Sequence, residues 1–272
     1  MPNIEIIPLG TVAPYPKENK NCPGFLIKYK DYNIMLDCGN GCTRLMDLPK
    51  DLSNLKIFIS HLHPDHFGDL VSLLQAIYVY RKYGMVDNNI ELYIPDNDFV
   101  NETIDDYDED GWYKPQTIKK HSLEYRYIET YAKEAEVNLI GYSENTFKFE
   151  YATIKTLLVP HPISTYAIRI NTEYGDITYS ADTGTNNRLG TFAHNSSIFI
   201  CESTFLKGQY RASNNHLYAY EAAKIAKDAN VGKLLLTHFW PEIEKEQYVK
   251  EAQKIFDNTE AAIEGKKLIL RR

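Results

Sequence analysis

The sequence predicts an α/β fold in which a single domain spans residues 1–272. Short apolar runs with the length and β-branched content of strands recur along the chain, and some alternate with stretches of helical period. Several of these predicted strands end directly before a His or an Asp. Because loops at one edge of a layered α/β structure converge, we expect these side chains to form one site.

The first part of the chain contains most of the predicted strands and one long helix. The strands are expected at residues 3–9, 25–29, 33–36, 55–59 and 90–94. Leu70, Leu73, Leu74 and Ile77 recur at helical spacing. They predict a helix over 69–83, and Gly84 follows it as a stop signal.

The second part of the chain alternates strands with helices. Strands are expected at residues 152–159, 166–171, 176–179, 197–201, 233–236 and 267–270. An alanine-rich helix is expected at 216–229, opened by His216, and a further helix at 248–256.

The span 96–150 fits this alternation least, and we treat it as an insertion in the domain. It contains a predicted helix at 122–128 and an acidic run at 105–110. The simplest interpretation of the acidic run is a solvated loop. A lid or a homodimer contact near the mouth of the active site is the alternative.

Composition and charge restrict the partners and the compartment. The net charge of −7 argues against a long nucleic-acid partner, because proteins that bind the phosphate backbone are usually basic. There is no basic-then-apolar leader and no apolar run near the roughly 20 residues of a membrane span. The four cysteines form no C-x-x-C pair, which is typical of buried thiols in a reducing compartment. We therefore expect a cytoplasmic protein without a membrane segment.

The densest cluster of metal-binding residue types follows the predicted strand 55–59. It reads His61-x-His63-x-Asp65-His66, and it holds three of the eight histidines of the chain. A polar loop that is His-rich by chance is the alternative. Neutral imidazoles and a carboxylate are ligands that suit Zn²⁺, with Mn²⁺ and Fe²⁺ as the alternatives.

This H-x-H-x-D-H segment resembles the central signature of the metallo-β-lactamase-fold hydrolases. The resemblance implies a four-layer αββα sandwich and two divalent metal ions, most simply Zn²⁺. It also extends to three later strand ends, Pro160-His161-Pro162, Ser180-Ala181-Asp182 and Thr237-His238. The implied ligands are His61, His63 and His161 for the first metal, Asp65, His66 and His238 for the second, and Asp182 as a bridge. Asp37, which follows the strand 33–36, is implied to support the His-rich loop without binding metal.

Two further segments resemble the phosphodiesterase branch of this superfamily, which includes the tRNA 3′-processing ribonuclease RNase Z. They are Glu202-Ser203-Thr204-Phe205 and the segment around His216. The resemblance implies that His216 contacts the scissile phosphate and assists the leaving oxygen, with Glu202 orienting it. A start of a helix at His216 would add backbone N–H groups for an anion. Asp65 is expected to accept the proton of the attacking water as well as to bind metal.

The expected reaction is therefore hydrolysis of a small phosphodiester, such as a cyclic nucleotide. RNase Z-like cleavage of tRNA precursors is one alternative. The long tRNA-binding arm of that enzyme would lie between His161 and Asp182, where this chain has room only for a hairpin. Hydrolysis of a thioester or lactam is a second alternative. A binding protein with a structural metal site is a third.

Overall fold

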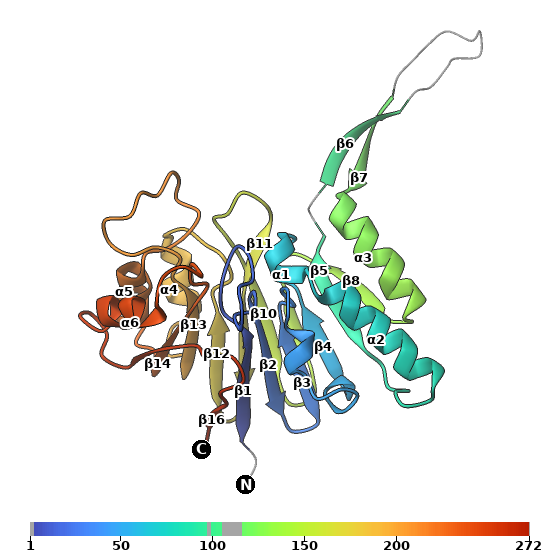
Figure 1. The fold of residues 1–272 in the computed structure, drawn as a ribbon, viewed down its shortest axis with the longest axis horizontal. Coiled ribbons are helices and arrows are strands. Elements are labelled where there is room, and N and C mark those ends of the chain that lie inside the picture. The colour runs from blue at the N-terminus through green and yellow to red at the C-terminus, as the bar shows by residue number, and fades with distance from the viewer. Residues whose placement is uncertain (1–2, 97–98, 105–115, 272) are drawn as a thin grey trace.

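Two large β-sheets pack face to face at the centre of the molecule (Figure 1). The structure, a computed structural model, describes residues 3–96, 99–104 and 116–271. In this part of the chain the first sheet has seven strands. In spatial order they are β16 (Leu268–Leu270), β1 (Ile4–Gly10), β2 (Gly24–Tyr29), β3 (Tyr32–Leu36), β4 (Leu55–Phe58), β5 (Glu91–Pro95) and β8 (Asn138–Tyr142).

The second sheet also contains seven strands within the described residues. In spatial order they are β15 (Thr259–Ala261), β14 (Lys233–Thr237), β13 (Ile198–Glu202), β12 (Gly175–Tyr179), β11 (Thr165–Thr172), β10 (Thr153–Val159) and β9 (Thr146–Lys148). Pairing is antiparallel from β9 to β12 and parallel from β12 to β15. The carboxyl ends of β12, β13 and β14 therefore lie at the same edge.

Helices cover the outer face of each sheet (Figure 1). On the first sheet these are α2 (Leu70–Lys82) and α3 (Leu123–Glu134), which share one core with it. On the second they are α4 (Asn187–Phe192), α5 (Ala219–Asp228) and α6 (Lys245–Ala252). The result is the predicted four-layer αββα arrangement.

Strand side chains alternate between the two cores, because successive residues of a strand point to opposite faces. In β2, Phe25 and Ile27 lie in the core between the sheets, and Leu26 lies in the core under the helices. Both faces of the sheet are covered, so the strands read as continuous apolar runs in the sequence.

The span 96–150 contributes several elements to the sandwich itself. Strand β8 joins the edge of the first sheet, β9 joins the edge of the second, and α3 packs beside α2. Strands β6 (Phe99–Ile104) and β7 (Gln116–His121) pair only with each other in the described residues and extend away from the sandwich (Figure 1). The acidic run at 105–110 lies outside the described residues.

The expectation that His216 opens a helix is wrong. Helix α5 begins at Ala219, with Tyr218 as its N-cap. Residue 218 forms a β-bridge with Phe205, and the buried Leu217 donates its backbone N–H to Glu202. These contacts keep the chain extended through 218, and the Glu221 side chain then accepts the backbone N–H of Tyr218 at the helix start.

None of the helices in the described ranges has both the length and the apolar character that a bilayer-crossing helix requires.

Candidate metal centre and active site

The His-rich loop leaves the first sheet at the end of β4. His61 follows the strand in a fully buried position, and His63 is the extended N-cap residue of the one-turn helix α1 (Pro64–Phe67). Pro64 stands at the first helical position, where its missing N–H costs no hydrogen bond. The turn carries Asp65 and His66, both buried, back toward the sheet edge.

The other candidate ligands come from the second sheet. His161 follows β10, Asp182 follows β12, and His238 follows β14. His238 has a φ of 61°, in the left-handed region that non-glycine residues seldom adopt. Such backbone strain is retained where the surrounding structure fixes it, and it concentrates at functional sites.

One group of donor atoms comes from His61, His63, His161 and Asp182. His63 Nδ1 lies 3.1 Å from His61 Nε2 and 3.0 Å from His161 Nε2. Asp182 Oδ2 lies 3.7 Å from His61 Nε2 and 4.0 Å from His161 Nε2. Donors placed tetrahedrally around Zn²⁺ are about 3.3 Å apart, so this spacing suits a single metal ion.

A second group comes from Asp65, His66 and His238, with Asp182 beside it. The Nε2 atoms of His66 and His238 both lie 3.7 Å from Asp65 Oδ2. Asp182 Oδ1 lies 3.3 Å from His66 Nε2, and its Oδ2 lies 3.0 Å from His238 Nε2. Asp182 thus lies between the two groups, and all seven predicted ligands are brought together.

Three buried nitrogen and oxygen atoms of the candidate ligands have no hydrogen-bond partner in the described part of the chain. They are His66 Nε2, Asp182 Oδ1 and His238 Nε2. Buried polar atoms in native proteins are nearly always paired with protein, water or an ion. The imidazole and carboxylate donors are those that divalent transition metals take, so the residues fit the metal ions that the resemblance implies.

Burial and charge divide the imidazoles into two electrostatic classes. Burial holds the pKa of His61 well below its ordinary value and lowers the pKa of His161 to about 4, so both are neutral, as metal ligands are. Burial also opposes charge on His238, but the carboxylates of Asp182, Asp65 and Glu202 together outweigh it and raise the pKa of His238 to about 10. The negative potential of Asp182 that attracts a proton there would equally attract a metal cation.

Asp37 supports the His-rich loop, as expected. Its carboxylate is fully buried and accepts hydrogen bonds from the backbone N–H and the hydroxyl of Ser60. It also lies 2.7 Å from Nδ1 of His66 and accepts the Tyr179 hydroxyl. Nδ1 of His66 is therefore engaged, and Nε2 is the nitrogen that faces the candidate metal.

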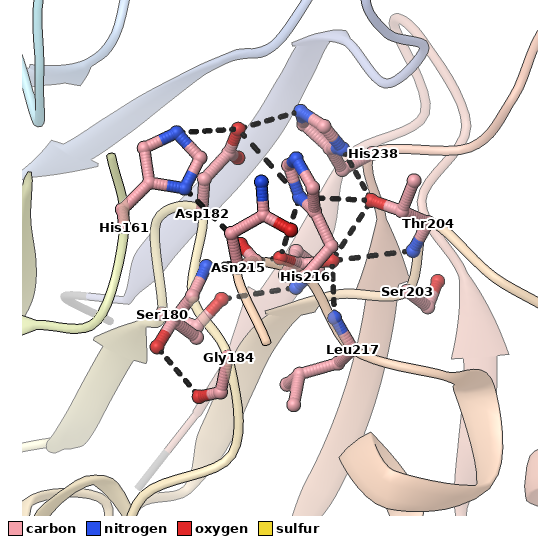
Figure 2. Close-up of polar contacts among 12 residues, drawn as sticks. His161, Ser180, Asp182, Gly184, Ser203, Thr204, Asn215, His216, Leu217 and His238 are labelled. Carbon is pink, nitrogen blue, oxygen red and sulfur yellow. Dashed lines mark hydrogen bonds and ion pairs between the residues drawn. The ribbon is translucent and has the colours of Figure 1, made fainter. Parts of the chain in front are cut away.

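His216 lies at the same centre, although it is not among the seven predicted ligands. Figure 2 shows His161, His216 and His238 around Asp182. His216 Nδ1 lies 2.9 Å from the buried carboxylate of Glu202, as expected, and 4.0 Å from Asp182 Oδ2. Burial opposes charge on His216, but the carboxylates of Glu202 and Asp182 together outweigh burial and raise the pKa of His216.

Three contacts at the site were not predicted from the sequence. The carbonyl of Asn215 lies 3.1 Å from Nδ1 of His161, the Thr204 hydroxyl lies 2.8 Å from Nδ1 of His238, and the Ser60 hydroxyl lies 3.0 Å from Nδ1 of His61. Ser60 directly precedes the H-x-H-x-D-H motif, and Thr204 stands in the segment Glu202–Phe205, which was the available signal. The contact of the Asn215 carbonyl could not be predicted, because every residue carries a backbone carbonyl whatever its type.

Comparison with known proteins places nearly all of the chain in one family. The family model described as "Anti-Pycsar protein Apyc1" matches residues 4–260. A ribonuclease Z of Thermococcus sibiricus is 28% identical over 93% of this chain and 91% of its own length. The probable metallo-hydrolase YhfI of Bacillus subtilis is 25% identical over 93% of this chain and 94% of its own length.

The crystal structure of YhfI from Bacillus subtilis, a metallo-β-lactamase-fold protein, superimposes on this chain with a TM-score of 0.80. The match covers 98% of this chain and 99% of YhfI, at 24% identity. This likeness confirms the predicted fold.

Proposed function

The chain belongs to the anti-Pycsar Apyc1 family of cyclic-nucleotide-degrading proteins, and from this premise we propose that it hydrolyses the phosphodiester bond of a small cyclic nucleotide. It is a metallo-hydrolase of the RNase Z-like branch and uses divalent metal ions, as its relatives indicate. The observation that carries the finer proposal is the position of His216, which shares a donor group with Asp182 and His238 although neither candidate metal needs it as a ligand.

We assign the first metal ion to His61, His63 and His161 and the second to Asp65, His66 and His238, with Asp182 between them. Zinc is the proposed metal because the donor set is rich in imidazole, and Mn²⁺ and Fe²⁺ are the alternatives. When bound, two such ions supply an activated water and polarise the phosphate oxygens.

Asp65 is proposed to accept the proton of the attacking water. Its carboxylate is buried at the centre, and Oδ2 lies at equal distances from His66 and His238. Burial opposes the charge of this carboxylate, but the imidazoles of His66 and His238 lower the pKa of Asp65, so it stays ionised, as a proton acceptor must.

His216 is proposed to assist the leaving oxygen. Glu202 holds Nδ1 of His216 at 2.9 Å, so Nε2 is the nitrogen left to meet a substrate. The Glu202 carboxylate is itself fixed by the backbone N–H groups of Thr183 and Leu217. The imidazole is therefore held in one orientation before substrate arrives, which is how a positioned acid lowers a barrier.

A small substrate is favoured over tRNA by the charge of the protein. The net charge of −7 repels a polyanion such as tRNA. Between His161 and Asp182 the described chain contains only the β11–β12 hairpin, whose strands lie within the second sheet. A cyclic nucleotide carries a single phosphate and requires no extended basic surface.

The proposal is tested by assaying metal-analysed protein on a panel of cyclic nucleotides and on bis(p-nitrophenyl) phosphate. A thioester, nitrocefin and a tRNA precursor are assayed in parallel. We expect phosphodiester turnover that disappears with a chelator and returns with Zn²⁺ or Mn²⁺. Cleavage of the tRNA precursor with a steep salt dependence would favour the ribonuclease alternative. Turnover of only the thioester or nitrocefin would contradict a phosphodiesterase.

A further inference from the structure

Two buried carboxylates that are not candidate ligands organise the imidazoles of the site, one from each sheet. Asp37 follows β3 in the first sheet, and Glu202 ends β13 in the second. The exposed fractions of these residues are 0% and 1%. Each contacts one imidazole directly, and each also contacts a hydroxyl that touches a second imidazole.

In the first sheet the hydroxyl belongs to Ser60. Its Oγ lies 2.8 Å from Asp37 Oδ2 and 3.0 Å from Nδ1 of His61. The same carboxylate oxygen lies 2.7 Å from Nδ1 of His66. Asp37 thus contacts His66 directly and reaches His61 through Ser60.

In the second sheet the hydroxyl belongs to Thr204 (Figure 2). Its Oγ1 lies 2.9 Å from Glu202 Oε2 and 2.8 Å from Nδ1 of His238. A longer contact of 3.3 Å joins it to Nδ1 of His216, which Glu202 Oε1 contacts at 2.9 Å. Glu202 thus contacts His216 directly and reaches His238 through Thr204.

Counting protons fixes the direction of these hydrogen bonds. An ionised carboxylate only accepts, so each hydroxyl must donate its one proton to Asp37 or Glu202. Each hydroxyl oxygen can then only accept from the imidazole. Nδ1 of His61 and of His238 must therefore carry a proton, so Nε2 is the nitrogen that offers its lone pair when a metal binds.

We propose that Ser60 and Thr204 are matched positioning residues, each of which fixes one metal-ligand imidazole with Nδ1 protonated and Nε2 free. The inference rests on the proposed metal assignment, in which His61 serves the first ion and His238 the second. Ser60 then acts on the first metal ion, and Thr204 acts on the second.

A residue that only filled space would leave a different signature. Thr204→Val keeps the shape of the side chain and removes the hydroxyl, whereas Thr204→Ser removes a methyl group and keeps the hydroxyl. A packing role therefore predicts that valine preserves function and serine does not. The proposed relay, a carboxylate that reaches an imidazole through a hydroxyl, predicts that serine preserves function and valine does not.

The experiment is a two-step zinc titration of the metal-free protein against a chromophoric chelator, with no substrate present. We expect Thr204→Val to weaken one binding step by about 10–100-fold, the usual effect of losing a partner of a ligand imidazole. Thr204→Ser should bind as the wild type does. Ser60→Ala should weaken the other step.

A second readout follows the imidazole protons in the zinc-loaded, ¹⁵N-labelled protein. The Nδ1 proton of His238 should exchange slowly with solvent in the wild type and in Thr204→Ser, and fast in Thr204→Val. Unchanged exchange and affinity in Thr204→Val would overturn the inference. So would Thr204→Val and Ser60→Ala weakening the same step.

These outcomes are separable from failure of the proposed function. Wild-type protein that binds two zinc ions and shows both signatures, but hydrolyses no phosphodiester, would contradict the phosphodiesterase proposal and leave the relays intact. Wild-type protein that hydrolyses a phosphodiester but lacks both signatures would contradict the relays and leave the phosphodiesterase proposal intact.

Discussion

At the scale of single residues, the proposed role of His216 is what would separate phosphodiester chemistry from the other reactions of this fold. It is held by Glu202 and is not needed by either proposed metal ion. We expect His216→Ala to lower kcat on a cyclic nucleotide by about 10²–10⁴-fold, the usual contribution of a positioned acid. Bound zinc, measured by elemental analysis, should stay at the wild-type level.

The matched control is His194→Ala, which removes an exposed imidazole next to α4 that belongs to none of the donor groups of the described residues. It should leave kcat unchanged. Full activity of His216→Ala would remove this residue from the mechanism and favour a thioester or lactam substrate.

At the scale of loops and elements, Gly184 and Asn214 connect the segment that carries Asp182 to the segment that carries His216. A Cβ at Gly184 would lie 1.9 Å from the carbonyl oxygen of Asn214, which is backbone and cannot rotate away. The Asn214 side chain also accepts the backbone N–H of Thr185 and donates to its carbonyl.

We therefore expect Gly184→Ala to shift the His216 segment and to lower kcat/KM by about 10²-fold, as a displacement of roughly 1 Å can. Gly190→Ala is the control, because its Cβ would meet nothing within 4 Å in helix α4. That substitution should leave kcat/KM unchanged. Equal values of kcat/KM for Gly184→Ala and Gly190→Ala would show that the close approach of Gly184 to Asn214 does not position the His216 segment.

The β6–β7 hairpin is the element that we propose as the true insertion, in place of the whole span 96–150. Its strands pair only with each other in the described residues, whereas β8, β9 and α3 belong to the sandwich. Replacing residues 99–119 with a short Gly-Ser linker should keep cooperative thermal unfolding and bound zinc. Loss of a single unfolding transition would show that the sandwich depends on the hairpin.

The sequence could predict most of the sandwich because its strands are buried on both faces and read as unbroken apolar runs. It could not predict the short edge strand β9, which has only three residues and a mostly exposed pattern. Helix α4 was missed because its six residues contain a single buried side chain, Leu189, and its start depends on the Asn186 side chain.

The candidate ligands could be predicted because each of their motifs follows the end of a strand. The start of α5 could not, because alanine-rich helical propensity extends back to His216 while tertiary contacts of Leu217 and Tyr218 keep the chain extended. The contacts of the Ser60 and Thr204 hydroxyl groups could not be predicted either, because the sequence does not show which imidazole a hydroxyl touches.

At the scale of the whole molecule, bound metal should stabilise the fold. The donor atoms are buried, and some have no hydrogen-bond partner in the described chain, so the metal-free state leaves polar groups without compensation. Zinc at about 100-fold above its dissociation constant should add about 2.7 kcal/mol for each site. Chelation should therefore lower Tm by several degrees in a thermal melt.

Asp182→Ala supplies the comparison for that measurement, because Asp182 lies between both donor groups. Its Tm should respond little to zinc. Asp228→Ala, an exposed position at the end of α5, should respond as the wild type does. A zinc response of Asp182→Ala equal to that of the wild type would contradict the bridging assignment.

The candidate ligands are divided between the two sheets, with His61, His63, Asp65 and His66 from the first and His161, Asp182 and His238 from the second. Each proposed ion therefore joins the two halves of the sandwich. We therefore expect the loss of an ion to require the ligands of one half to withdraw from it at this edge. The rate of metal loss to excess chelator should then reach a plateau, and that plateau would measure how often the two halves of the molecule part.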